Sequence, residues 1–156
     1  MPGPGSAIQR GILLGVLISI LVVGLGKIPG LRPPPSNPDL FARLDYSHGW
    51  PRAIWVIITI ALSPLVEEIL FRGILYGGYR RSFGPQWAAI LTTLLFVACH
   101  GPKAASNFPF LIGLVAGSLA SLWCRLNSGA VGPAVGVHLG YNLARTFIIL
   151  VARATR

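Results

Sequence analysis

The chain has 156 residues, of which 53% are hydrophobic and only 11% are charged. This composition excludes an ordinary soluble domain, because the apolar residues fall in long blocks rather than in alternating or amphipathic patterns. The formal net charge of +9 does not indicate a nucleic-acid partner, since the basic residues are scattered at the ends of apolar blocks and suit anionic lipid headgroups.

Long apolar blocks predict an all-α, polytopic transmembrane bundle with about five membrane-embedded helices. The blocks are residues 11–26, 53–76, 87–100, 108–123 and 130–151. Strands of a β-barrel would instead be short segments of alternating polarity. The third and fourth blocks are short for full spans, so we expect flanking residues to extend them or the helices to be tilted.

The first block follows Arg10 and ends in Gly24-Leu25-Gly26, a weak match to the cleavage site of a signal sequence. We expect this helix to be retained. A Pro-rich stretch at 27–51 follows, and it is expected to be an extramembrane or interfacial connection. The sequence thus predicts an N-terminal helix and Pro-rich loop (1–52), a helical core (53–151) and a basic tail (152–156).

Two carboxylates, Glu67 and Glu68, interrupt the second block. An acidic side chain at the centre of a membrane helix costs roughly 2.5 to 3.5 kcal/mol, so the pair is interpreted first as a functional site. Glu68 and Arg72 share one helical face, whereas Glu67 is turned about 100° away. We therefore expect Glu68 to pair with Arg72, and Glu67 to face a cavity as a general base. A purely structural Glu-Arg pair is the alternative.

Two further polar groups lie on later blocks. His100 ends the third block, with Phe96 one turn earlier on the same face, and His138 and Asn142 share a face of the fifth block. Taken alone, His100 would be a solvated or capping residue, and His138 with Asn142 would be a structural clamp. Their joint occurrence with the carboxylates favours a shared site.

The fifth block also has a stripe of small residues on roughly the opposite side, suited to close helix packing. The stripe consists of Gly132, Gly136 and Gly140. The two cysteines, Cys99 and Cys124, form no C-x-x-C pattern, and we expect them to be small buried residues rather than a disulfide.

In their order along the chain, these segments resemble the three motifs of the CPBP intramembrane proteases. This family includes CAAX-processing endopeptidases and bacteriocin-processing or immunity (Abi) proteins. Residues 67–72 are similar to its E-E-x-x-x-R motif, residues 96–100 to F-x-x-x-H, and residues 138–142 to H-x-x-x-N. All three motifs are complete, and the resemblance covers about 54–150.

The resemblance implies a glutamate-dependent intramembrane endopeptidase that needs no cofactor or metal. It implies that Glu67 and His100 orient and deprotonate a water molecule, and that His138 and Asn142 stabilise the oxyanion. Supporting roles are implied for Glu68, Arg72 and Phe96. The implied substrate is a peptide or membrane protein, prenylated or not, and we expect the plasma membrane of a prokaryote as the location.

Other functions are compatible with the same residues. A noncatalytic immunity or scaffold protein of the same fold is one alternative. A zinc-dependent membrane protease is a second, because two glutamates and two histidines could bind zinc, although no H-E-x-x-H motif is present. Ser63 lies near the carboxylates but without a G-x-S-x-G setting. The small size of the chain leaves open whether an oligomer or a partner subunit completes the site.

Overall fold

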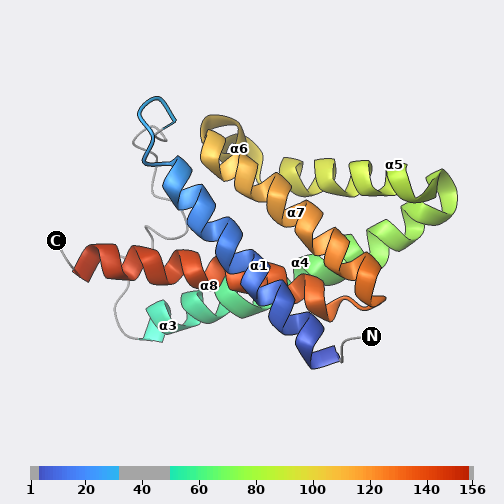
Figure 1. Ribbon diagram of the computed structural model, residues 1–156, viewed down its shortest axis with the longest axis horizontal. Coiled ribbons are helices and arrows are strands. Elements are labelled where there is room, and N and C mark those ends of the chain that lie inside the picture. Colours follow the sequence, from blue (N-terminus) through green and yellow to red (C-terminus); the bar gives the residue numbers. More distant parts are fainter. Residues whose placement is uncertain (1–3, 32–49, 155–156) are drawn as a thin grey trace.

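The computed structural model describes residues 4–31 and 50–154, and the elements in this part of the chain are all helices (Figure 1). They are α1 (Pro4–Leu25), α3 (Trp50–Ile57), η1 (Ile58–Leu62), α4 (Ser63–Glu68), η2 (Ile69–Leu75), α5 (Tyr76–Cys99), α6 (Gly101–Ser106), α7 (Phe108–Ser128) and α8 (Gly132–Ala154). The segments η1 and η2 are π-helical. The predicted all-α class is confirmed. Most of the predicted Pro-rich loop (32–49) and the last two residues of the predicted tail lie outside the described residues.

Four helical runs are long and apolar enough to cross a membrane, and they are Gly5–Leu25, Ala53–Cys99, Phe108–Ser128 and Gly132–Ala152. The second run has 47 residues and contains both the second and the third predicted blocks. A straight helix of that length would measure about 70 Å, more than twice the thickness of a bilayer core. The run changes direction instead at Gly84, which has φ 81° and ψ 170° and is followed by Pro85 (Figure 1). The two blocks therefore remain separate helical stretches.

The second predicted block ends at 76 and the third begins at 87, but the residues between them are helical except at this kink. The helix starts at Tyr76 and continues through the glycine pair at 77–78. Tyr76 and Ala88 are buried together with Leu122 of α7, and Tyr79 packs against them. These contacts outweigh the weak helix propensity of glycine. Flanking residues extend the fourth block, as expected, because α7 continues to Ser128 and ends at Gly129, whose φ is 71°.

The helix α1 packs against α7 and α8. Gly11 and Gly15 of α1 face the backbone of α8 so closely that an added side-chain carbon would meet the carbonyl groups of Pro133 and Val137. The absence of a side chain at these two positions is therefore what allows α1 to approach α8.

The facing side of α8 is built in the same way. A side-chain carbon at Gly136 would lie 2.8 Å from the carbonyl oxygen of Ile8, and one at Gly140 would meet the backbone of Ile12. Gly132, by contrast, is near only the side chain of Ile8, at 3.5 Å. The predicted packing stripe is confirmed at Gly136 and Gly140, where two helix backbones touch.

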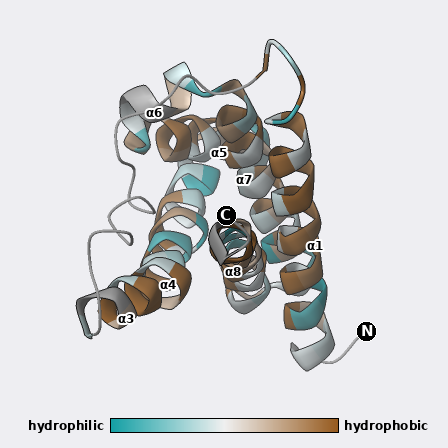
Figure 2. Cartoon of the chain, turned by 90° about the vertical axis from the view of Figure 1, so that its left-hand side faces the viewer, coloured by the Kyte–Doolittle hydropathy of each residue, from teal (hydrophilic) through white to brown (hydrophobic). Residues whose placement is uncertain are grey.

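The interior of the bundle contains many polar groups, and its outer surface is largely apolar (Figure 2). The buried polar side chains include Ser19, Thr59, Glu68, Arg72, Thr92, Ser118, Ser121 and Thr146. Leucines such as Leu13 and Leu94 are by contrast more than half exposed. Such an arrangement suits a lipid environment, where helices associate through close packing and hydrogen bonds rather than through burial of apolar surface.

Both described cysteines are free, as predicted. Cys124 is buried in the bundle, but Cys99 is exposed, so the prediction of burial is wrong for Cys99. Cys99 is the last residue of α5, where the chain leaves the helix toward α6.

Candidate active site

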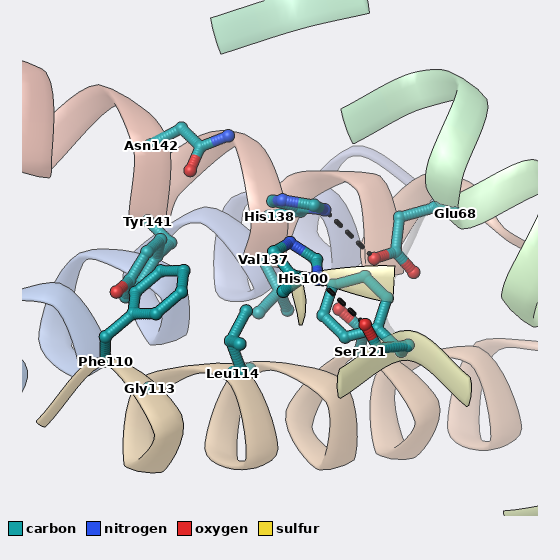
Figure 3. Close-up of a pocket in the computed structure, with 12 residues that line it drawn as sticks. Glu68, His100, Phe110, Gly113, Leu114, Ser121, Val137, His138, Tyr141 and Asn142 are labelled. Carbon is teal, nitrogen blue, oxygen red and sulfur yellow. Dashed lines mark hydrogen bonds and ion pairs between the residues drawn. The ribbon is translucent and has the colours of Figure 1, made fainter. Parts of the chain in front are cut away.

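A cavity of about 60 Å³ lies where α4, the end of α5, α7 and α8 meet (Figure 3). It is lined by Glu68, Phe96, His100, Phe110, Gly113, Leu114, Gly117, Ser121, Val137, His138, Tyr141 and Asn142. Since about 10 to 15 Å³ is enough for one water molecule, the cavity has room for a few waters but not for a peptide. The lining residues come from segments far apart in the sequence.

The carboxylates lie at the end of α4, between the two π-helical segments. Isolated π-helical turns often occur at functional sites, since the wider turn changes which backbone groups are bonded within the helix. In η1, the carbonyl group of Thr59 accepts a hydrogen bond from Asn142 Nδ2 at 2.9 Å. The segment η2 carries Arg72. The π-helical turns thus flank α4 and connect it with α7 and α8.

Glu68 is the more deeply buried carboxylate, with 1% of its side chain exposed. Its Oε2 lies 3.2 Å from Arg72 Nε, and its Oε1 lies 3.2 Å from His138 Nδ1. Arg72 Nη2 in turn donates to the carbonyl oxygen and to Oγ of Ser118, at 3.1 and 2.8 Å. The guanidinium carbon is 4.7 Å from the ring centroid of Phe96. The predicted ion pair of Glu68 and Arg72 is therefore present, and it also fixes α7 and α8.

Glu67 has a different environment. Its side chain is 27% exposed, and it is not among the residues that line the cavity. One oxygen, Oε1, accepts a hydrogen bond from Ser63 Oγ, and the other, Oε2, lies 3.9 Å from His138 Nε2. No hydrogen bond joins Glu67 to His100 among the described side chains. The structure thus places Glu67 beside His138, whereas Glu68 lines the cavity.

His100 lies at the junction of α5 and α6, and its ring points toward the cavity (Figure 3). Its Nδ1 is 2.8 Å from the carbonyl oxygen of Phe96. Because a carbonyl oxygen can only accept, Nδ1 carries the hydrogen, and in the neutral ring Nε2 keeps a lone pair. The ring lies between Phe96 and Phe110, with centroid distances of 4.8 and 6.1 Å. The aromatic side chains hold the imidazole in place, and its free nitrogen is a base.

His138 and Asn142 share one face of α8, as predicted, and both line the cavity. His138 lies between the two carboxylates, with Nδ1 at Glu68 and Nε2 on the side of Glu67. Asn142 uses one N–H for the Thr59 carbonyl group, which leaves its second N–H and its side-chain oxygen for a ligand. The three sequence motifs therefore meet around one cavity.

The contribution of α7 was not predicted. Gly113, Gly117 and Ser121 line the cavity, and Ser118 holds Arg72. A signal for them exists in the sequence, since Gly113, Gly117 and Ser121 are small residues four positions apart and so lie on one helical face. Within residues 4–31 and 50–154, no group of three or more His, Cys, Asp or Glu side chains is arranged to hold a metal ion.

Residues 49–144 match the model of the type II CAAX prenyl endopeptidase Rce1-like family, and the chain belongs to that family. This confirms the family resemblance predicted from the three motifs. The matched range contains all the residues predicted to form the site. Together with the four long apolar helices, family membership identifies an integral membrane protein.

A protein of Escherichia coli described as an uncharacterized 24.3 kDa protein is 34% identical to this chain over 133 residues. The aligned part covers 81% of this chain and 58% of that protein, so the chain spans less than two thirds of its relative's length. No solved structure matches the chain.

Proposed function

We propose that the protein is an intramembrane endopeptidase that hydrolyses a peptide bond with a water molecule activated by Glu67 and His100. The observation that carries this proposal is the convergence of Glu68 of α4, His100 at the junction of α5 and α6, and His138 and Asn142 of α8 on one cavity with room for a few waters. Burying such side chains within membrane helices is costly, so their convergence indicates function. The proposed substrate is a peptide or membrane protein, prenylated or not, in the plasma membrane of a prokaryote.

The two carboxylates have different roles in this mechanism. Glu68 Oε2 lies 3.2 Å from Arg72 and its Oε1 lies 3.2 Å from His138, whereas the nearest cationic or histidine nitrogen to Glu67 Oε2 is His138 Nε2, at 3.9 Å. Glu67 is therefore the carboxylate that can accept a proton from water. We place the attacking water at the margin of the cavity beside His138, where His100 Nε2 supplies a second base. The water oxygen attacks the peptide carbonyl carbon, and its proton passes to the leaving amine.

The oxyanion is stabilised by His138 and Asn142. Since Nδ1 of His138 donates to Glu68, donation from Nε2 to an oxyanion requires a hydrogen on both ring nitrogens. The resulting imidazolium lies between two carboxylates, and Glu68 fixes its orientation. Asn142 adds its second N–H. Donors aimed at a developing oxyanion in a water-poor site typically contribute a factor of about 100 to 1000 each to the rate.

Two variants test this division of roles. Glu67→Gln should lower cleavage by at least about 100-fold at a normal yield of folded protein, because it removes the base but leaves buried Glu68 with both of its partners, Arg72 and His138. Arg72→Ala should lower the yield of folded protein as well, because it leaves buried Glu68 without its counter-charge. Cleavage is followed by mass spectrometry of peptides in membranes containing each variant, and folding by size-exclusion chromatography.

The two variants serve as controls for each other, because only Arg72→Ala should lower the yield of folded protein. Wild-type cleavage by Glu67→Gln would refute the assignment of Glu67 as the base. An unchanged peptide profile in both variants, with both proteins folded, would favour the noncatalytic immunity or scaffold protein.

A further inference from the structure

A second and larger cavity, of about 400 Å³, lies on the surface between the start of α1, the end of α7 and the start of α8. Its lining includes Ile8, Arg10, Trp123, Cys124, Asn127 and Pro133, and we call it the α1/α7 groove. Cys124 and Pro133 are buried and form its floor, while Ile8, Arg10, Trp123 and Asn127 are exposed around it. Its size is that of a typical small-molecule site.

The position of the groove fixes its depth in the membrane. It lies near one end of three of the four potential spans, within about two helical turns of Gly5, Ser128 and Gly132. Helix ends of this kind lie at the boundary between the hydrocarbon core and the headgroups, where tryptophan side chains are enriched. A molecule in the groove would therefore have one end among acyl chains and the other at the headgroups.

The lining of the groove has an apolar part and a positively charged part. Ile8, Trp123 and Pro133 present apolar surface, and Arg10 supplies a positive charge. None of the lining residues is acidic, and Arg10 makes no ion pair within the part of the chain that the structure describes. A guanidinium group binds a phosphate in a two-point geometry. In a zwitterionic phospholipid an ammonium group offsets the phosphate charge, whereas an anionic headgroup leaves that charge for Arg10. A free phosphate ion would not need the long apolar surface.

We propose that the α1/α7 groove binds one anionic phospholipid, with its phosphate at Arg10 and an acyl chain along Trp123 and Ile8. The groove is separate from the candidate active site but close to it. Cys124 and Pro133 on its floor are three and four residues from Ser121 and Val137, which line the catalytic cavity. The bound lipid would hold together the ends of α1, α7 and α8.

Trp123 serves as a probe, because a bromine atom on a neighbouring acyl chain quenches indole fluorescence. A variant with Trp123 as its only tryptophan (Trp50→Phe, Trp55→Phe, Trp87→Phe) is reconstituted in neutral phosphatidylcholine vesicles. Brominated phosphatidylglycerol or brominated phosphatidylcholine is then added in increasing amounts. Half-maximal quenching should need about fivefold less of the anionic lipid. Arg10→Gln should remove this difference, and Arg10→Lys should retain part of it.

The matched control is Arg81→Gln, which removes an exposed arginine that does not line the groove, and it should keep the preference. Equal quenching by the two lipids would overturn the proposal, since it indicates contact with bulk lipid only. Persistence of the preference in Arg10→Gln, or its loss with added inorganic phosphate, would also overturn it. Native mass spectrometry of the chain with all four tryptophans should show one retained phosphatidylglycerol, absent in Arg10→Gln.

Discussion

Neighbouring residues can have unlike environments when a helix lies between two others, and Glu67 and Glu68 illustrate this. Glu68 is turned toward Arg72 and α8, and it is almost fully buried. Glu67 keeps partial exposure and a single hydrogen bond, from Ser63. We expect the carboxylate with the longer contact, 3.9 Å from His138, to take part in proton transfer, and the one held at 3.2 Å by arginine and histidine to position its neighbours.

Single substitutions of two glycines on α7 test whether the cavity is needed for cleavage. A side-chain carbon at Gly117 would meet no atom within 4 Å, although Gly117 lines the cavity. Gly117→Val should therefore fold normally and lose most cleavage activity, because its methyl groups occupy space that water and the substrate carbonyl group need. Thermal unfolding and peptide cleavage are both measured.

The matched variant is Gly113→Ala, one turn earlier on the same face. Its added carbon would lie 2.8 Å from Val22 Cγ2 and 2.9 Å from the hydroxyl oxygen of Tyr141. Gly113→Ala should therefore lower stability by about 1 to 3 kcal/mol. Full activity of Gly117→Val would show that the cavity is not the place of reaction.

At the scale of elements, α8 makes different contacts on two of its faces. One carries His138 and Asn142 toward α4 and η1, and the other carries Gly136 and Gly140 against the backbone of α1. The position of the histidine therefore depends on a helix that contributes no side chain to the cavity of the candidate active site. This coupling assigns α1 a structural role in the site.

The coupling predicts the effect of a single methyl group on α1. Gly15→Ala should destabilise the fold by about 1 to 3 kcal/mol or displace α8, because the new carbon meets the carbonyl group of Val137 and lies 2.7 Å from the backbone nitrogen of Tyr141. Gly24→Ala is the control, since a side-chain carbon there meets nothing within 4 Å. Thermal unfolding in detergent distinguishes them, and equal melting temperatures would contradict the packing of α1 on α8.

The sequence predicted the helical class and the pairing of Glu68 with Arg72, because these depend on hydrophobic length and on local helical spacing. The family was predicted from the resemblance of three ordered motifs. The sequence did not predict that Glu68 would line the cavity. Helical periodicity gives the face on which a residue lies, but the second contact of Glu68, with His138, depends on how α8 packs. The continuous helix through 77–78 was missed for a related reason, since contacts with α7 stabilise it.

At the scale of the whole molecule, the mechanism predicts independence from metal. If Glu67 and His100 activate water, the purified protein should remain active after treatment with a chelator and contain well under one zinc ion per chain. Metal content is measured by elemental analysis, and activity by peptide cleavage. One tightly bound zinc per chain, with activity lost on its removal and restored on its return, would establish the zinc-dependent alternative.

The order in which Glu68, Arg72 and the residues that bind them are synthesised also has a consequence for membrane insertion. Ser118, which holds Arg72, and His138, which holds Glu68, are synthesised 46 and 70 residues later than the groups they bind. Arg72 is only four residues from Glu68, so it can neutralise this carboxylate as soon as their helix forms. The second span can therefore leave the insertion machinery with Glu68 already neutralised, before α7 and α8 exist.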